Sequence, residues 1–270
     1  MSVAYAERGP SDLLRPFVVC TWTRDARAGA SASDRILPDG CVDIIWDQRS
    51  VFVAGPDTGP VLVVADARTT SYAGVRFRPG AAPALLRLPA YELRDQRVPL
   101  EALWGPAGTR SLTDRLGVAA STTDAVRELV RALTDRLGAP VDPLAAAATA
   151  AIATSPSLRV AGLADRLGVT ERTLHRRVQA AVGYGPKVLQ RVARFRRFLS
   201  VAPRRDELGL AGLARIAGYA DQAHLGRECT ALAGLTPLEL VRASDVRLVQ
   251  DGLTVAPAGC DVTTRPGARS

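Results

Sequence analysis

The sequence predicts an α+β protein in which a small β-barrel or sandwich-like domain is followed by a helical linker and by an all-α domain. Three observations support this fold class. Short β-branched runs fill roughly the first hundred residues, apolar residues then recur every three or four positions, and a unit of about fifty residues is repeated near the C-terminus. We therefore divide the chain into residues 1–105, 106–154, 155–243 and 244–270.

The N-terminal segment contains several short β-strand patterns. Arg35-Ile-Leu-Pro-Asp-Gly-Cys-Val-Asp-Ile-Ile-Trp46 combines a Pro-Asp-Gly turn with a following strand. Further β-branched runs, bounded by Gly and Pro, lie at Val51–Ala54, Val61–Ala65 and Ser71–Arg78. Several short strands at this spacing predict a small barrel or sandwich.

Aromatic side chains in this segment are candidates for an effector pocket. Trp22, Trp46 and Tyr72 lie within or beside the predicted strands, where they either line a cavity or, as the simpler interpretation has it, pack in the core. The strands are rich in Val, Ile and Trp, and residues 1–154 contain no histidine. We therefore expect a mainly apolar pocket without a metal ion.

The segment that follows has helical periodicity. An amphipathic stripe there is either intramolecular core or a dimer seam, with core favoured. Leu144–Ala153 is predicted as an Ala-rich helix, and residues 244–270 are expected to be loosely ordered. The stripe consists of Val126, Leu129, Val130, Leu133 and Leu137.

Positive charge is concentrated in one third of the chain. Residues 155–243 contain 15 Lys and Arg and 7 Asp and Glu, a balance of +8, whereas the rest of the chain holds 20 of each. The whole net charge of +8 therefore lies in this segment. Such a distribution favours a polyanionic partner that binds one domain.

The strongest signal is an internal repeat in the same segment. Leu163–Pro186 and Leu213–Pro237 each contain an apolar helix pattern, a glycine, a second helix pattern and a Gly-x-x-Pro sequence. Gly168 corresponds to Gly218 at a spacing of 50 residues, and the later positions correspond at 51. One extra residue is therefore expected in the second turn.

Each repeat has the parts of a helix-turn-helix. The glycine permits the positive φ of a sharp turn, and Thr170 is a good N-cap for the second helix. Leu174 and Val178 fall on one inner face at a spacing of four, as Leu225 and Cys229 do in the other repeat. We therefore predict two helix-turn-helix units.

The opposite face of each second helix carries long hydrogen-bond donors and small side chains. Arg can bond guanine, Gln can bond adenine, and small residues permit close approach in the major groove. Without the repeat, such charges would be ordinary solvated helix faces. The candidates for base readout are Arg172, His175, Arg176, Gln222, Ala223, Gly226 and Arg227.

Phosphate contacts are expected from helix ends and from the helix that connects the two units. Arg194, Arg196 and Arg197 are equally well interpreted as an exposed face of that helix. The candidates for phosphate contact are Thr170, Lys187, Arg191, Arg194 and Thr236.

At these residues the sequence resembles the DNA-binding domain of the AraC/XylS family of transcription regulators. The resemblance covers about 155–243 and rests on the paired units, on the Gly-x-x-Pro after each second helix, and on the connecting helix Pro186–Leu199. The sequence departs from the family at Val178, Leu225 and Cys229, where larger aromatics are usual.

The N-terminal part, with Leu37–Asp43 and Gly74–Gly80, looks like an uncharacterised domain often fused to such DNA-binding domains, which implies a sensor or dimerisation role. The resemblance as a whole implies a cytoplasmic, non-enzymatic regulator, most commonly an activator, that binds double-stranded DNA through two recognition helices. It further implies regulation through a small-molecule effector or through homodimerisation, with RNA polymerase as a partner if the protein activates.

No catalytic, metal or cofactor site is predicted. The four cysteines are scattered, and His175 and His224 are the only histidines. Asp39, Asp43 and Asp47 are interpreted as a turn acid and strand-edge charges rather than as a carboxylate site. No signal peptide and no apolar stretch of spanning length is present, so no membrane partner is expected.

Three other functions stay open. A metal-dependent β-barrel enzyme fused to a DNA-binding module is disfavoured because its barrel would need several histidines. A DNA-alkyl acceptor would need an activated cysteine in a recognisable cluster. A ligand-binding protein with a degraded DNA domain would not bind DNA even at low salt.

Overall fold

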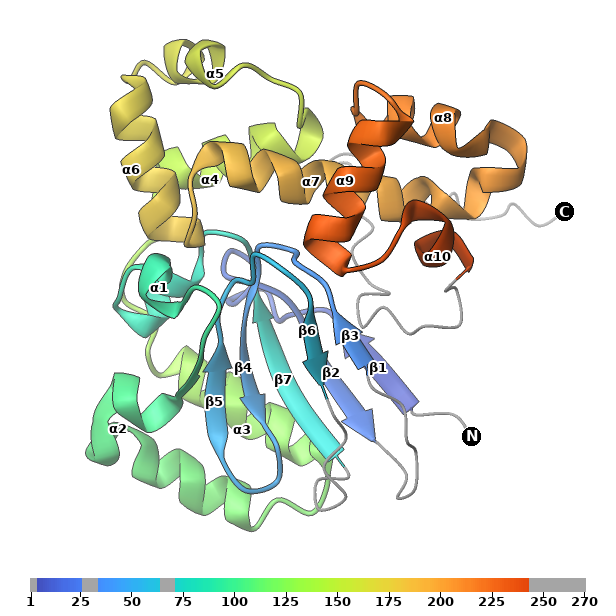
Figure 1. Cartoon of the computed structure of the whole chain (residues 1–270). Helices are drawn as coiled ribbons and strands as arrows, with labels where there is room; N and C mark the ends of the chain where they lie inside the picture. Colours follow the sequence, from blue (N-terminus) through green and yellow to red (C-terminus); the bar gives the residue numbers. More distant parts are fainter. Residues whose placement is uncertain (1–3, 26–33, 64–70, 243–270) are drawn as a thin grey trace, which may run out of the picture.

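The computed structural model describes residues 4–25, 34–63 and 71–242. A sheet domain lies below a helical domain in Figure 1, and the two domains touch. The tail 244–270, expected to be loosely ordered, lies outside the described residues. The strands are β1 (Ala4–Arg8), β2 (Val18–Asp25), β3 (Asp34–Ile36), β4 (Val42–Trp46), β5 (Val51–Ala54), β6 (Val61–Val63), β7 (Ser71–Phe77) and β8 (Arg97–Pro99).

The sheet domain is sandwich-like. Six strands form one antiparallel sheet in the order β1-β2-β7-β4-β5-β8, and β3 pairs with β6 in a separate two-stranded sheet. The two sheets enclose a cavity between them. This confirms the predicted fold class, in its sandwich-like form rather than as a closed barrel.

Alternation along the strands gives the six-stranded sheet two different faces. On β4, Val42, Ile44 and Trp46 belong to the apolar core, whereas Asp43 and Ile45 line the cavity on the other side. The apolar face is covered by α2 and α3 (Figure 1). The helices are α1 (Ala82–Leu86), η1 (Ala90–Leu93), α2 (Leu100–Gly117), α3 (Thr122–Thr134), α4 (Pro143–Thr154), α5 (Val160–Arg166), α6 (Glu171–Val182), α7 (Pro186–Val201), η2 (Ala202–Arg204), α8 (Arg205–Ala217), α9 (Gln222–Ala233) and α10 (Pro237–Arg242).

The amphipathic stripe lies on α3 and is used within the molecule. Leu129 and Leu133 are each 1 % exposed and share a core with Val75 and Phe77 of β7. Val126 and Val130 pack at the edge of that core. The stripe is therefore intramolecular core in this structure.

The helical domain contains the two predicted helix-turn-helix units, α5–α6 and α8–α9. Gly168 has φ +66° and Gly218 has φ +87°, as a sharp turn requires. Thr170 is the N-cap of α6 and accepts a hydrogen bond from the backbone N–H of Thr173. Asp221 caps α9, three residues after Gly218, whereas Thr170 follows Gly168 by two. The extra residue in the second turn is thus present.

The connecting helix α7 holds the two units together. Its buried side chains Val192, Phe195 and Phe198 form one core with the inner faces of α6 and α9. The same core includes the buried face of α4, through Ala148 and Ile152. We propose that α4 belongs to the DNA-binding unit, so that the unit starts near residue 141 rather than at 155.

Packing of α4 gives a test of this boundary. A fragment of residues 141–243 is expected to be about 2–4 kcal/mol more stable than 155–243, because the shorter fragment exposes the apolar surface that α4 covers. Thermal unfolding followed by circular dichroism measures the difference. Ala148→Asp should remove most of the gain, whereas Ala147→Asp, on the exposed side of α4, should leave it. Equal stability of the two fragments would contradict the proposed boundary.

Candidate nucleic-acid interface and ligand pocket

The two second helices present opposite faces to core and solvent. Leu174, Val178, Leu225 and Cys229 are all 0 % exposed, so the inner faces are fully buried. Val178, Leu225 and Cys229, which stand where larger aromatic residues are usual, therefore leave the core closed to solvent. On the outer face, Gly226 is half-buried, and the other candidates are exposed: Arg172, His175, Arg176, Gln222, Ala223 and Arg227.

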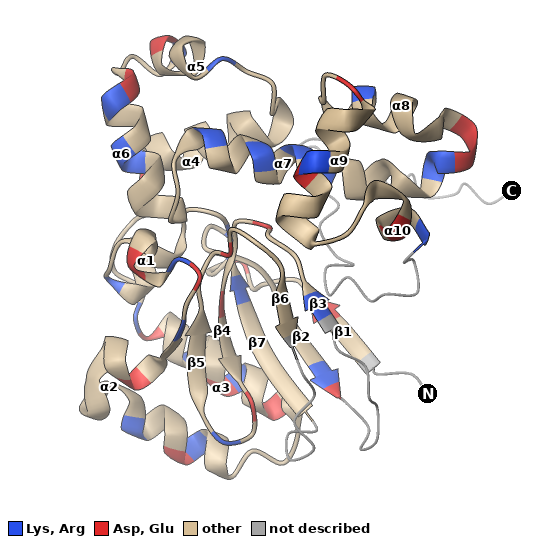
Figure 2. Ribbon diagram, viewed as in Figure 1, with Lys and Arg blue, Asp and Glu red and all other residues tan. Residues whose placement is uncertain are grey.

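The helices α6 and α9 lie on either side of α7 and begin at the side of the domain away from the sheet (Figure 1). Figure 2 shows Lys and Arg positions along α6, α7 and α9. Arg172, Arg176, Arg227 and Lys187 form no ion pair with any residue in the described part of the chain. This arrangement leaves exposed positive charge on one side of the domain.

Two of the arginines expected at phosphate have partners inside the domain. Arg191 pairs with Glu228 of α9, with Nε 2.9 Å from Oε2. Arg194 donates to the carbonyl of Pro156 at 3.3 Å and lies 5.9 Å from the ring centre of Tyr219. These contacts tie α7 to its neighbours, so a phosphate would have to compete with them.

The remaining phosphate candidates are helix-end residues or exposed. Thr170 caps α6, and Lys187 is exposed in the first turn of α7. Thr236 precedes α10 and forms a capping box with Glu239, whose carboxylate accepts hydrogen bonds from the Thr236 backbone N–H and hydroxyl. Those hydrogen bonds lower the pKa of Glu239.

Neither histidine is placed to bind a metal. His175 lies beside Gly185, where an added Cβ would fall 2.3 Å from the imidazole ring. His224 packs edge-on against Tyr219 in the other unit, with ring centres 5.2 Å apart. In the described ranges no group of three or more His, Cys, Asp or Glu could hold a metal ion.

The cysteine thiols of the described chain are buried. Burial raises the pKa of Cys20 and of Cys229 to about 12, and it raises the pKa of Cys41 well above its usual value. These thiols stay protonated at neutral pH, so none is the activated nucleophile that an alkyl acceptor requires. Cys260 lies outside the described residues.

An ion pair fixes α6 against α4. Arg177 of α6 donates two hydrogen bonds to the carboxylate of Asp142, which also caps α4 by accepting from the backbone N–H groups of Leu144 and Ala145. The Arg177 hydrogen bond is the main cause that lowers the pKa of Asp142. The same residue thus starts one helix and positions a recognition helix.

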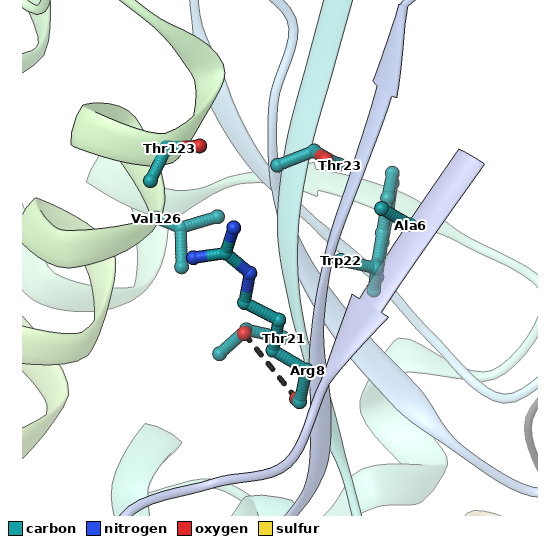
Figure 3. Close-up of a pocket in the computed structure, with 7 residues that line it drawn as sticks. All are labelled: Ala6, Arg8, Thr21, Trp22, Thr23, Thr123 and Val126. Carbon is teal, nitrogen blue, oxygen red and sulfur yellow. Dashed lines mark hydrogen bonds between the residues drawn. The ribbon is translucent and has the colours of Figure 1, made fainter. Parts of the chain in front are cut away.

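A small hollow lies between the sheet and α3. It is lined by Thr21, Thr23, Thr123 and Val126, and Figure 3 shows Arg8 reaching across it towards α3. Its volume of about 40 Å³ has room for a water molecule rather than for an effector.

The larger cavity lies between the two sheets and measures about 360 Å³. Trp22 and Tyr72 line it, as expected for pocket residues, whereas Trp46 lies on the opposite face of the sheet. The lining is mainly apolar, as expected, but aspartates and arginines accompany the apolar side chains. The charged residues are Arg24, Asp39, Asp43, Asp47, Asp57, Arg76 and Arg97.

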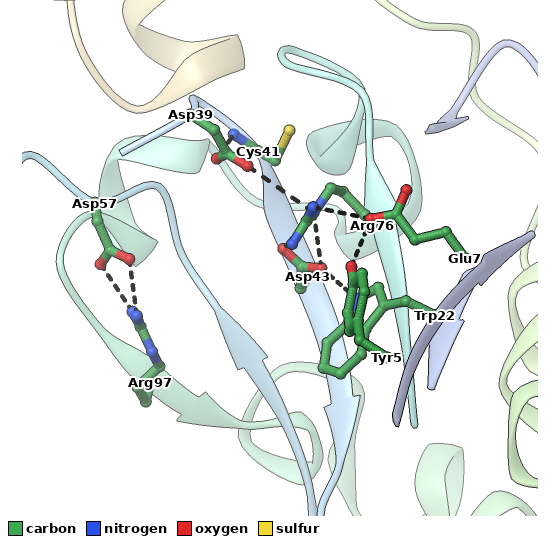
Figure 4. Close-up of polar contacts among 9 residues, drawn as sticks. All are labelled: Tyr5, Glu7, Trp22, Asp39, Cys41, Asp43, Asp57, Arg76 and Arg97. Atoms are coloured by element: carbon green, nitrogen blue, oxygen red, sulfur yellow. Dashed lines mark hydrogen bonds and ion pairs between the residues drawn. The ribbon is translucent and has the colours of Figure 1, made fainter. Parts of the chain in front are cut away.

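Arg76 is the centre of a buried cluster at the inner end of the cavity (Figure 4). Its Nε lies 3.2 Å from Asp43 and 3.9 Å from Asp39, and its Nη1 lies 3.8 Å from Glu7. Trp22 donates to Asp43 at 2.7 Å. The interpretation of Asp43 as a strand-edge charge was wrong, because β4 is a central strand and the residue faces inward.

A second charged pair lines the same cavity. Arg97 forms two hydrogen bonds with Asp57, of 2.9 and 2.8 Å, in the bidentate geometry typical of Arg and carboxylate. Figure 4 shows this pair apart from the Arg76 cluster. Nothing in the sequence pattern marked Arg76 or Arg97 in advance, because pairing across strands depends on register.

The C-terminal ends of both second helices rest on the sheet domain. Gly183, which ends α6, is so close to Pro56 and Ala90 that an added Cβ would lie 2.5 Å from the Pro56 ring. At the end of α9, Arg35 of β3 donates to the carbonyl of Ala233 at 2.7 Å. Elements that border the cavity therefore touch both units.

Two family models match the chain. Residues 163–243 match a family described as a helix-turn-helix domain, and this match includes both turns and both second helices just described. This C-terminal part of the chain is an AraC-type helix-turn-helix domain. Residues 6–99 match a domain of unknown function (DUF6597). The match at residues 163–243 points to a transcription factor.

Crystal structures of ToxT from Vibrio cholerae are also similar to this chain. An apo ToxT variant is 12 % identical, with a TM-score of 0.43, and the match covers 87 % of this chain and 99 % of that one. ToxT with a bound unsaturated fatty acid is 11 % identical, with a TM-score of 0.43 and coverage of 89 % and 94 %. No curated protein matches the chain. None of the helices in the described ranges is long and apolar enough to cross a bilayer.

Asp142 gives this AraC-type domain a defined pH dependence. Because its folded pKa is lowered, the stabilisation it contributes is present above the ordinary carboxyl pKa and is lost as pH falls through the lowered value. Asp142→Asn should therefore lower the melting temperature of the protein most near neutral pH, and the difference should shrink below about pH 4. Asp165→Asn, on the exposed side of α5, is the matched control. A difference that stays constant with pH would mean that the ion pair does not contribute.

Proposed function

We propose that this protein is a sequence-specific, ligand-responsive transcription regulator in which α6 and α9 read successive major-groove segments. The observation that carries the proposal is the exposed outer face of both helices beside their buried inner face. Because α7 is packed against both helices, their spacing on DNA is set by one rigid core. A separation of roughly one helical turn, about 34 Å along DNA, fits this type of binding.

Base readout is assigned to side chains without internal partners. Arg172 and Arg176 on α6, and Arg227 on α9, can each extend a guanidinium to a guanine edge. Gln222 occupies the first turn of α9, and Gly226 lets the helix approach closely. Lys187 is assigned to phosphate, because it is exposed and lies outside both recognition helices.

Ligand response is assigned to the contact between the domains. The turn between β3 and β4 lines the cavity through Leu37, Asp39 and Cys41. Leu37 also belongs to the core of the helical domain, together with Tyr184 and Leu189. A molecule bound in the cavity would therefore press on residues that support the start of α7, and it would shift the population of DNA-binding arrangements.

Substitutions can separate base reading from phosphate contact. On a site selected from randomised DNA, Arg227→Ala and Arg176→Ala should each cost about 1–3 kcal/mol of binding and relax the preference at one position. Lys187→Ala should weaken all sequences equally and lower the salt slope by about one unit. Arg131→Ala, exposed on α3, is the matched control. Uniform losses for Arg176→Ala and Arg227→Ala on every sequence would show that these helices hold DNA without reading it.

A substitution at the contact between Arg35 and the end of α9 tests whether the sheet domain is coupled to DNA binding. Arg35→Ala removes the hydrogen bond to the Ala233 carbonyl. The DNA affinity of the full chain should then move towards that of the 141–243 fragment, measured by fluorescence anisotropy on the same site. Arg49→Ala, on the exposed turn between β4 and β5, is the control. If Arg35→Ala leaves the affinity of the full chain unchanged while the fragment differs from it, the coupling does not run through this contact.

A further inference from the structure

We propose that the cavity between the two sheets binds an organic cation, a protonated or quaternary amine with an apolar body. Only one part of this inference rests on the proposed function, namely that the cation is the effector of the regulator. The site is defined by the cavity itself, and its chemical preference follows from the side chains that line it.

The cavity has the size and shape of a small-molecule site. Its volume of about 360 Å³ falls in the range of ligand pockets, and it is covered on both sides by sheet. Residues from seven strands, β2 to β8, and from the three loops that connect β3 to β4, β4 to β5 and β5 to β6 converge on it, so it is not a gap at a single edge. The apolar and aromatic part of its wall consists of Trp22, Ile36, Leu37, Ile45, Phe52, Val61, Leu62 and Tyr72.

Charge at the inner end of the cavity is out of balance. Three carboxylates, those of Glu7, Asp39 and Asp43, lie within 4 Å of the single guanidinium of Arg76. Two other arginines line the cavity: Arg97 is taken up by its bidentate pair with Asp57, and the Arg24 guanidinium lies 5.7 Å from the ring centre of Tyr72. Fully ionised, the Arg76 cluster therefore carries an excess of two negative charges.

This excess discriminates between classes of ligand. Buried charge without a counter-charge is costly, and the cost grows as water is excluded. A carboxylate or phosphate ligand would add to the excess, and a neutral ligand would leave it uncompensated while removing solvent. A cation is the class of ligand that reduces the excess.

An aromatic ring stands beside the carboxylates. The Trp22 indole donates a hydrogen bond to Asp43 and lies against Gly74, where an added Cβ would fall 2.3 Å from the ring. The absence of a side chain at Gly74 thus fixes the indole against the sheet. Aromatic faces next to carboxylates suit ammonium groups, because the ring quadrupole and the charge attract the same cation.

In the empty pocket a proton can take the place of the cation. Burial raises the pKa of Asp43, and the neighbouring Asp39 carboxylate raises it further. An ammonium group that enters would displace this proton, so its affinity should rise with pH until Asp43 is ionised. The titratable and charged groups that surround this end of the cavity are Tyr5, Glu7, Cys20, Asp39, Cys41, Arg76, Tyr184 and Arg196.

The test uses three probes that share one apolar body. Binding of 2-phenylethylammonium, 2-phenylethanol and phenylacetate to the full chain is measured by isothermal titration calorimetry. The ammonium should bind at least about tenfold more tightly than the alcohol, and the carboxylate should bind least. Its affinity should rise from about pH 5 to about pH 8, and buffers of different ionisation enthalpy should report proton release.

Variants locate the site. Asp43→Asn keeps an oxygen for Trp22 but removes a charge, and it should lower ammonium affinity at least about tenfold while leaving the alcohol unaffected. Glu7→Gln, on the edge strand β1, should act in the same direction if Asp43→Asn folds poorly. Asp165→Asn on α5 should change nothing.

Three results would overturn the proposal: no binding of the ammonium, equal binding of the ammonium and the alcohol, or tightest binding of phenylacetate. DNA affinity is measured separately on the same samples. Ammonium binding without any change in DNA affinity would support the cation site and contradict the ligand response. Sequence-specific DNA binding without ammonium binding would contradict the cation site and support the proposed DNA-binding function.

Discussion

The C-terminal ends of both recognition helices rest on the sheet domain, and the rest of the arrangement depends on this constraint. Gly183 closes α6 against Pro56 and Ala90, and the last carbonyl of α9 accepts a hydrogen bond from Arg35. A helix reads DNA with its N-terminal turns. The sheet domain therefore holds the C-terminal ends of both helices, and it leaves open to solvent the N-terminal turns to which the proposed function assigns base readout.

The same contact connects the cavity to the helices by a short route. Gly40, with φ +80°, brings the β3–β4 turn against Tyr184, whose hydroxyl is buried without a hydrogen-bond partner among the described residues. An unsatisfied buried hydroxyl costs about 1–3 kcal/mol. A shift of the turn that gave this hydroxyl a partner would recover part of that free energy. The junction is therefore a place where two arrangements can be close in stability, as a switch requires.

The helical domain was largely predictable from sequence, because its signals are local. Glycine turns, the Thr170 cap and the spacing of Leu174 and Val178 each specify structure within a few residues. The assignment of α4 was not predictable in this way, because an Ala-rich helix carries no mark of which core it joins. Its packing against α6 and α7 is the observation that supports placing it with the DNA-binding unit.

The pocket was predictable only in part. Trp22 and Tyr72 were expected to line it, but Trp46 lies on the other face of the sheet, because the face on which a strand residue lies depends on its pairing register. The register of β4 against β7 places Asp43 directly opposite Arg76. A buried ion pair of this kind joins residues 33 positions apart, so no pattern along the chain announces it.

Whether an arginine can contact DNA depends on its partners within the protein rather than on the net charge of the chain. Arg76 and Arg97 are used up inside the sheet domain, and Arg177 and Arg191 are used to position α6 and α7. The basic groups that keep no ion pair within the described chain, such as Arg176 and Arg227, lie on the outer faces of the recognition helices. A charge of +8 thus favours a polyanion as partner, but the pairing of individual side chains decides which of them can contact it. Among the carboxylates, those of Glu7, Asp39 and Asp43 outnumber the one guanidinium of Arg76 that they surround. This excess of negative charge is the basis of the preference for a cation that we propose for the cavity.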